Sequence, residues 1–277
     1  MASGIKLMEE MEREQPQAGQ LYFWWLGQLG YAIRTERLRI CIDPFLSDRA
    51  TRRHAPILEA EMLEKTDYLF GTHLHDDHID LPVWKTVAKH LPKVKFVVPR
   101  ALKAQLCEEL GVAPERMLGI ADGETFQEEG LSITGVAAAH ELLEQDGNGD
   151  YLQMGYYVRA DGVSFYHSGD CCIYEGLYRR LRALGSPDVA FLPINGRDAK
   201  RLRANCIGNM TYQEAVDLCG MLRPGLSVPG HYDMFAANSE NPLLFSDYLD
   251  AKYPGLRCWI GPHGTKVKAE AKNEASP

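Results

Sequence analysis

One order of secondary structure occurs twice along this chain of 277 residues, and that recurrence constrains the fold more than any other feature. Each half begins with short apolar stretches separated by turn residues, which are typical of antiparallel strands, and continues with alternating strands and helices. The strand-rich stretches cover 20–45 and 116–170, and the mixed stretches cover 67–112 and 173–261. Because no linker separates the halves, the pattern predicts one α/β domain with two mixed β-sheets packed together and helices outside.

Local signals set several boundaries within this plan. Gly111 is well placed to end a helix over 101–112, and Asp161-Gly162 predicts a tight turn between two antiparallel strands. Residues 1–18 are polar and predict a helix or a loose arm ahead of a single domain over 19–277. The segment RCWIG, residues 257–261, is expected to be the final strand.

The chain is moderately acidic, with 30 basic against 38 acidic residues and a formal net charge of −8. This charge disfavours nucleic acid and anionic membranes as partners. The acidic N-terminal segment lacks the apolar core of a secretory signal, and the longest apolar runs fall short of a membrane span. Seven cysteines occur without a CxxC pair, so neither a disulfide framework nor a thiolate zinc site is expected. We therefore expect a cytoplasmic protein.

The most chemically informative segment is Thr72–His78, which follows an apolar strand and precedes a helix. It places three imidazoles beside carboxylates, a combination that core packing does not explain, because histidines compete poorly with aliphatic side chains for buried space. Neutral imidazole and carboxylate are ligands that suit zinc, manganese or iron. The alternative interpretation is a polar surface turn in which Asp76 or Asp77 caps the following helix.

The stretch HLHDDH, residues 73–78, matches the HxHxDH signature of the metallo-β-lactamase superfamily, which the chain resembles from Gln20 to Gly264. Three further landmarks of that superfamily follow in order, at the end of a strand, in HSGD and in PGHYD. These landmarks are His140, Asp170 and His231. The resemblance implies a four-layer αββα sandwich that holds two divalent metal ions.

The same resemblance distributes seven ligands between the two ions. One ion would be held by His73, His75 and His140. The other would be held by Asp77, His78 and His231, with Asp170 bridging both. The related flavodiiron branch has a glutamate at the position of His75, so redox chemistry is not expected.

Such a site suits hydrolysis. Two divalent ions about 3.5–4 Å apart can hold a shared hydroxide for attack and polarise the carbonyl or phosphoryl oxygen under attack. We expect Asp77 and Asp170 to be the catalytic carboxylates, with Asp77 orienting the nucleophile and passing a proton to the leaving oxygen. Because the implied ligands include no cysteine, Zn²⁺ or Mn²⁺ is the expected metal.

Two features bear on the substrate. The stretch Asn195–Asn205 carries a local charge of +3 after a strand that should end near the metals, so its arginines suit a phosphate or carboxylate, although a solvated loop is an equal alternative. In addition, WWLGQLGYAIRTE, YHSGD and PGHYDMFAAN resemble the L-ascorbate-6-phosphate lactonase group, which is associated with manganese and forms oligomers. The candidate substrate-binding residues are Asn195, Arg197, Arg201, Arg203 and Tyr232.

The expected activity is therefore the opening of a small anionic, possibly phosphorylated, sugar lactone, and a homo-oligomer is possible. A phosphodiesterase acting on a small cyclic or nucleotide diester is the alternative enzyme. A sensor that binds metal without turnover is the non-enzymatic alternative. Three other residues bear on the site: Asp43 resembles a carboxylate that supports a metal-bound histidine, His167 should pack beneath the site, and His263 could reach it.

Overall fold

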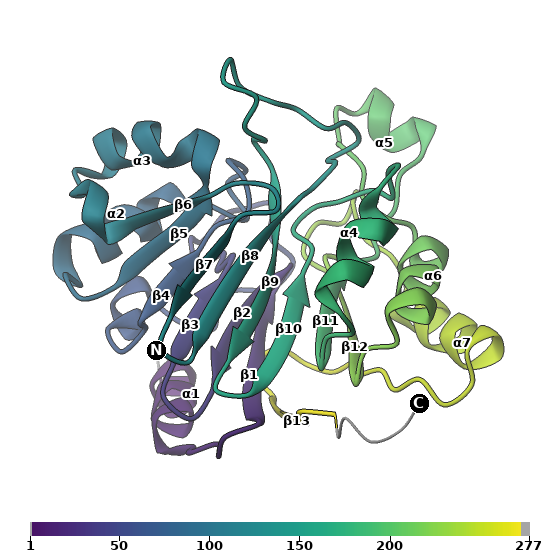
Figure 1. Ribbon diagram of the computed structural model, residues 1–277, viewed down its shortest axis with the longest axis horizontal. Helices are drawn as coiled ribbons and strands as arrows, with labels where there is room; N and C mark the ends of the chain where they lie inside the picture. Colours follow the sequence, from purple (N-terminus) through teal and green to yellow (C-terminus); the bar gives the residue numbers. More distant parts are fainter. Residues whose placement is uncertain (1, 273–277) are drawn as a thin grey trace.

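Two β-sheets packed face to face form the interior of the computed structural model, which describes residues 2–272 (Figure 1). The first sheet has the strand order β13-β1-β2-β3-β4-β5-β6. Its strands are β1 (Gln20–Gly27), β2 (Gly30–Arg34), β3 (Arg39–Ile42), β4 (Tyr68–Phe70), β5 (Lys95–Pro99), β6 (Met117–Ile120) and β13 (Lys266–Glu270).

The second sheet has the order β12-β11-β10-β9-β8-β7. Its strands are β7 (Thr125–Glu128), β8 (Leu131–Ala137), β9 (Met154–Ala160), β10 (Val163–His167), β11 (Val189–Pro193) and β12 (Leu226–Gly230). In each sheet the strands that come first along the chain pair antiparallel and the later ones pair parallel, except that the last strand, β13, pairs antiparallel with β1. This repeated order confirms the fold class predicted from the sequence.

Helices cover both outer faces, with α2 and α3 beside the first sheet and α4, α6 and α7 beside the second (Figure 1). The helices are α1 (Ala2–Arg13), α2 (Leu81–His90), α3 (Lys103–Leu110), α4 (Leu177–Leu184), α5 (Ala199–Arg203), α6 (Tyr212–Leu222) and α7 (Pro242–Lys252). Short 3-10 turns occupy Ala60–Leu63, Arg100–Leu102 and Pro114–Arg116. Gly111 ends α3 with a φ of +62°, as predicted. No helix within residues 2–272 is long and apolar enough to cross a membrane.

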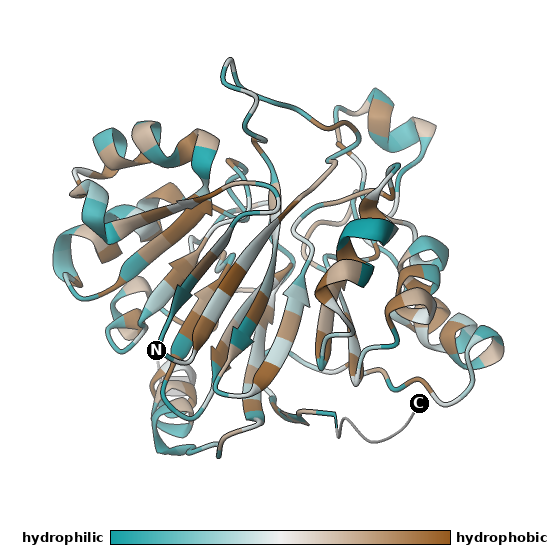
Figure 2. Ribbon diagram, in the orientation of Figure 1, coloured by the Kyte–Doolittle hydropathy of each residue, from teal (hydrophilic) through white to brown (hydrophobic). Residues whose placement is uncertain are grey.

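Apolar residues concentrate along the strands, as the brown segments of Figure 2 show. Between the sheets Phe23 packs against Phe191 and Trp259 with ring centroids 5.2 and 5.6 Å apart. A second apolar cluster fills the space between the first sheet and α2, where Trp84 packs on Phe96 at 5.1 Å. Burial on both faces explains why the parallel strands are continuous apolar runs.

The N-terminal segment is a helix that docks on the first sheet, whereas the sequence left a helix and a loose arm open. Trp24 donates from Nε1 to Glu10, and Arg34 donates to the carbonyl oxygens of Met11 and Glu12 at 2.6 and 2.7 Å. In Figure 1 α1 lies at the lower edge of the sheet, remote from the loops at its upper edge.

The prediction of a final strand over 257–261 is wrong. This segment makes only an isolated bridge between Cys258 and Ser227, and the last strand of the described chain is β13, which pairs with β1. Trp259 turns into the core against Phe23, so the segment crosses from one sheet to the other. The alternating sequence Lys-Val-Lys-Ala-Glu of β13 is instead suited to an edge strand with one buried face.

Candidate metal centre

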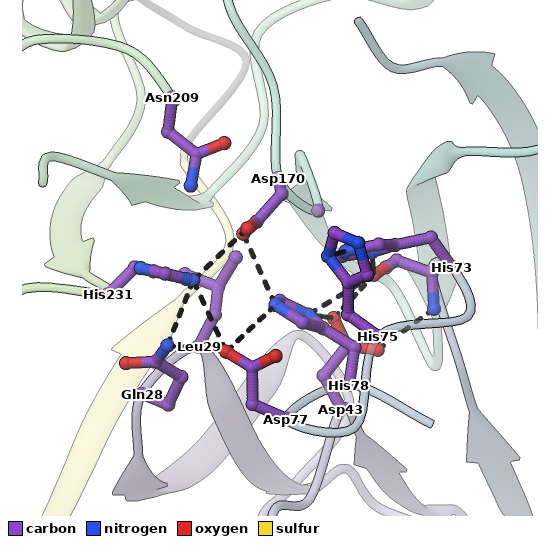
Figure 3. Close-up of polar contacts among 12 residues, drawn as sticks. Gln28, Leu29, Asp43, His73, His75, Asp77, His78, Asp170, Asn209 and His231 are labelled. Carbon is purple, nitrogen blue, oxygen red and sulfur yellow. Dashed lines mark hydrogen bonds and ion pairs between the residues drawn. The ribbon is translucent and has the colours of Figure 1, made fainter. Parts of the chain in front are cut away.

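Loops that follow four strands bring the predicted metal ligands together (Figure 3). Thr72–His78 follows β4, His140 follows β8, Asp170 follows β10 and His231 follows β12. Strand β4 belongs to the first sheet and the other three belong to the second, so the centre lies where the two sheets meet at one edge.

Three overlapping groups of side chains lie close enough to hold a metal ion, since the potential ligand atoms in each lie within 4.8 Å of one another. The groups are His73–His75–His140, His73–His78–Asp170 and Asp77–His78–His231. Because the groups share His73 and His78, they form one continuous cluster. It contains all seven residues that the superfamily resemblance implies, although their role as ligands stays a prediction.

Asp43 holds the loop Thr72–His78 from beneath. Its Oδ2 lies 2.7 Å from His78 Nδ1, and Thr72 donates to the same carboxylate from its backbone nitrogen and its hydroxyl. With Nδ1 engaged, His78 presents Nε2 to Asp170 Oδ1, 3.3 Å away. Asp43 adopts a φ of +46°, a conformation that costs about 1–3 kcal/mol and is common at functional sites. This is the contact expected of a carboxylate that supports a metal-binding histidine.

The turn His167–Asp170 positions the central carboxylate. Gly169 has a φ of +59°, and a Cβ there would lie 2.9 Å from Thr72 Cβ and 3.0 Å from the Met154 carbonyl oxygen. Only glycine allows this close approach. His167 is buried below the turn, with Nε2 2.8 Å from the Leu29 carbonyl oxygen, so it packs beneath the site as predicted.

Burial sets the protonation of two histidines. Burial and the neighbouring His78 lower the pKa of His73 well below its usual value, and burial also lowers the pKa of His140. Both imidazoles are therefore neutral near pH 7. Neutral imidazole is the form that offers a lone pair to a metal ion.

The other half of the cluster is ionised. Burial acts to lower the pKa values of His78 and His231, but Asp170 and Asp77 outweigh it and raise that of His231 to about 9. Burial acts to raise the pKa values of Asp170 and Asp77, and the two histidines outweigh it in turn. The buried carboxylates thus require nearby positive charge, which a divalent cation supplies as well as a proton does.

The donor set fits a metal ion by a second observation. His78 Nε2 and Asp170 Oδ1 are buried and have no hydrogen-bond partner among the described residues, because their 3.3 Å contact lacks hydrogen-bond alignment. A buried polar atom without a partner costs about 1–3 kcal/mol. A cation between the two atoms would remove that cost.

Gln28 joins this cluster although the sequence analysis does not predict it. Its side chain is fully buried, with Nε2 2.6 Å from Asp77 Oδ2 and 2.9 Å from His231 Nε2. Its carbonyl oxygen accepts hydrogen bonds from His231 N and Trp25 Nε1. Gln28 lies in the turn between β1 and β2 with a φ of +55°. A polar residue between two glycines in the apolar run WWLGQLGY is the signal that could have identified it.

A cavity of about 260 Å³ opens above the cluster. Five of the predicted ligands line its floor: His75, Asp77, His140, Asp170 and His231. The other lining residues, which we call the cavity wall, are Asn205, Cys206, Ile207, Phe235 and Asn238. Among the described residues that line this cavity there is no lysine or arginine.

The arginines predicted to bind substrate contact other parts of the protein. Arg197 makes a bidentate ion pair with Glu214 at 2.6 and 2.7 Å. Arg201 donates to the carbonyl oxygens of Asn195 and Ser239. Arg203 is exposed on α5 and is not part of the cavity wall. The structure therefore does not bring these cations to the cavity, and their role in binding stays a prediction.

Asn195, Tyr232 and His263 have different positions. Asn195 is buried and donates to Asn238 Oδ1 at 2.8 Å, so it supports the cavity wall from behind. Tyr232 is buried against Trp25, with ring centroids 5.1 Å apart. His263 Nε2 lies 2.9 Å from Asp233 Oδ2, and its ring packs on Trp25, outside the cavity lining.

Comparisons with known proteins agree with this fold and show the family to which the chain belongs. The profile of a family described as "Beta-lactamase superfamily domain" matches residues 38–232. A UPF0173 metal-dependent hydrolase of Methanoculleus marisnigri is 29% identical over 220 residues, covering 78% of this chain and 83% of that protein. One of Archaeoglobus fulgidus is 26% identical, covering 82% and 90%. The structure of Igni18, described as a novel metallo hydrolase of Ignicoccus hospitalis, is similar in fold, with 22% identity, a TM-score of 0.71 and coverage of 91% and 100%.

Proposed function

This chain belongs to the metallo-β-lactamase superfamily of metal-dependent hydrolases, and we propose that it opens a lactone or a closely related carboxylic ester. The observation that carries the proposal is the meeting of three overlapping His/Asp groups at the floor of an open cavity. A lactone carbonyl is neutral, and so is the cavity wall, whereas a phosphodiester brings a negative charge of its own. The choice of a lactone also rests on the resemblance of three segments to the ascorbate-6-phosphate lactonase group.

We further propose that the cluster holds two divalent ions, Zn²⁺ or Mn²⁺. The ligands in this proposal are those of the three groups, His73, His75, Asp77, His78, His140, Asp170 and His231. When bound, such ions make water nucleophilic near neutral pH and polarise the carbonyl under attack.

The protein's own residues orient this chemistry. Gln28 donates to Oδ2 of Asp77, which leaves Oδ1 of that carboxylate to accept a proton from a water molecule and to return it to the leaving oxygen. Asp43 holds His78, and the turn at Gly169 holds Asp170. These contacts limit rotation of the ligands, which lowers the cost of assembling the site.

The test combines elemental analysis with a substrate screen. Purified protein should contain stoichiometric zinc or manganese and release acid from at least one lactone in a panel of phosphorylated and unphosphorylated sugar lactones and alkyl lactones. His75→Ala and Asp170→Ala should lose metal and activity together. Protein without stoichiometric metal, whose activity survives both substitutions, would contradict the proposal. Faster hydrolysis of bis-p-nitrophenyl phosphate than of any lactone would favour the phosphodiesterase.

A further inference from the structure

The cavity wall carries no formal charge. Two of its members, Asn205 and Asn238, are neutral amides, and the other three are Cys206, Ile207 and Phe235. An anionic group that leaves water for such a wall loses hydration without gaining a counter-ion, which is costly. Bound divalent ions would supply positive charge at the floor, where the reacting carbonyl must sit, and not along the wall.

Three arginines in neighbouring segments are held by partners of their own, whereas Arg203, two residues before Asn205, is exposed. Arg197 is paired with Glu214, and Arg201 donates to two backbone carbonyl oxygens. Arg49 pairs with Asp76, beside the histidine-rich loop, at 2.7 Å. Recruiting any of them to a phosphate or carboxylate would require breaking these contacts.

One exposed aliphatic side chain, Ile207, lines the cavity, and further exposed aliphatic side chains lie in neighbouring loops. Glu141 accepts a hydrogen bond from the backbone nitrogen of Gly208, so the loops that carry Leu142 and Ile207 lie side by side. Leu142 is 70% exposed and Ile207 is 39% exposed. Leu74, within the histidine-rich loop, is also exposed. Single exposed aliphatic residues are ordinary, but Ile207 in the cavity wall with Leu142 in the adjoining loop offers an apolar surface to a ligand.

The deeper part of the wall combines an apolar face with neutral donors. Phe235 is half-buried and packs against Phe45, with ring centroids 6.1 Å apart, so its ring has a supported position. Asn238 accepts from Asn195 through Oδ1, which leaves its amide nitrogen to donate to a ligand. The wall therefore offers contacts for hydrocarbon and for a neutral oxygen.

We infer that the substrate is an uncharged lactone or ester with an apolar body, whose reacting carbonyl lies over the His/Asp cluster and whose body packs on Phe235 and Ile207. This inference rests on the proposed function and replaces the anionic sugar expected from the basic stretch Asn195–Asn205 with a different substrate class. Hydrolysis adds water across the acyl C–O bond, so a lactone gives the corresponding hydroxy acid and an ester gives a carboxylic acid and an alcohol.

The test uses two matched pairs of probes with metal-loaded protein. One pair is a δ-lactone with a hexyl chain and the same lactone with a carboxylate at the chain end. The other pair consists of the corresponding δ-lactams, which keep the shape and resist hydrolysis, so binding is measured by calorimetry without turnover. For both pairs the neutral member should be preferred by about tenfold or more, as expected for an unpaired charge against an uncharged wall.

Substitutions test which residues produce the preference for the neutral probe. Ile207→Asp should raise KM for the hexyl lactone about tenfold, with little change in kcat, because the contact lies away from the reacting carbonyl. Leu243→Asp is the matched control, since Leu243 is also an exposed aliphatic residue but lies on α7, outside the cavity wall. Arg203→Ala should leave KM unchanged for both members of the lactone pair.

Two results would overturn the inference: tighter binding of the carboxylated lactam, or a rise in KM for the carboxylated lactone in Arg203→Ala. Failure of the proposed function gives a different result. In that case no lactone or ester is hydrolysed, and the lactam pair still decides whether the cavity prefers a neutral, apolar ligand.

Discussion

The histidine-rich loop Thr72–His78 and the basic stretch Asn195–Asn205 both follow strands that end near the same cavity, yet their polar side chains have different partners. The loop directs imidazoles and a carboxylate at one another and at Asp170. The basic stretch directs Arg197 to Glu214 on α6 and Arg201 to nearby carbonyl oxygens. His78 Nε2, which has no hydrogen-bond partner among the described residues, is available to a ligand, whereas the paired guanidiniums stabilise the protein around the cavity.

The largest effect is expected from a substitution at the centre of the His/Asp cluster. Asp170→Asn keeps the size of the side chain but removes a negative charge between His78 and His231. We expect loss of bound metal and a fall in kcat/KM of roughly a thousandfold or more. Elemental analysis and steady-state kinetics check this. The matched control, Asp217→Asn on the exposed face of α6, should retain both metal and activity.

Asp43→Asn tests the support of His78 and should have the next largest effect. The carboxylate contacts His78 Nδ1 at 2.7 Å, and its loss should weaken metal affinity by about 10–100-fold. Competition with a chromophoric chelator measures the affinity without any substrate. Unchanged affinity, with only a lower melting temperature, would show that Asp43 merely stabilises the loop.

Gln28 provides a third, smaller test. Gln28→Ala removes the hydrogen bond to Asp77 Oδ2 and should lower kcat about tenfold with little change in KM, because the contact orients a carboxylate and does not reach the cavity wall. Gln28→Glu should be worse than alanine, since it places a second carboxylate beside Asp77. Equal kinetics for the alanine variant and the wild type would contradict this role.

Arg197→Ala tests the second region of the comparison, the basic stretch Asn195–Asn205. Loss of the bidentate pair with Glu214 should lower the free energy of unfolding by about 1 kcal/mol, as for a partly exposed pair of good geometry. KM for a neutral lactone should not change. Chemical denaturation and kinetics measure the two quantities, and a large rise in KM without loss of stability would indicate that Arg197 binds substrate.

The ion pair between Arg197 and Glu214 also makes the stability of the protein depend on pH. This is the smallest of the expected effects. Burial acts to raise the pKa of Glu214, but hydrogen bonds from Arg197 and Thr211 outweigh it, so the folded-state pKa lies below the usual value. The stabilisation is therefore complete above the pKa of Glu214 in the unfolded chain, which is about 4.3. It is lost as the pH falls through the lower pKa that Glu214 has in the folded protein. The stability difference between wild type and Arg197→Ala should be constant from pH 7 to 5 and shrink below that range.

The parts of the site that were predictable are those with local spacing. His73, His75 and His78 lie in one short loop after an apolar strand, so their common direction follows from the chain itself. Gln28 is not part of such a local group of ligand types. Its role depends on the turn between β1 and β2, which places Gln28 Nε2 2.6 Å from Oδ2 of Asp77, a residue distant in sequence. The final strand was misplaced for a similar reason: Trp259 and its neighbours have a strand-like composition, but they pack into the core between the sheets.

By itself, the sequence determined most of the order of strands and helices and the fold class, because hydrophobic periodicity and short-range spacing are properties of the chain. The set of His and Asp residues that meet followed from the resemblance to the superfamily. Only the tertiary structure decided which polar groups remain available to a ligand. Charged side chains as long as those of Arg197 and Arg201 pair with whatever the fold places beside them, and those partners come from other segments. For this reason we infer a neutral, apolar substrate where the sequence predicted an anionic one.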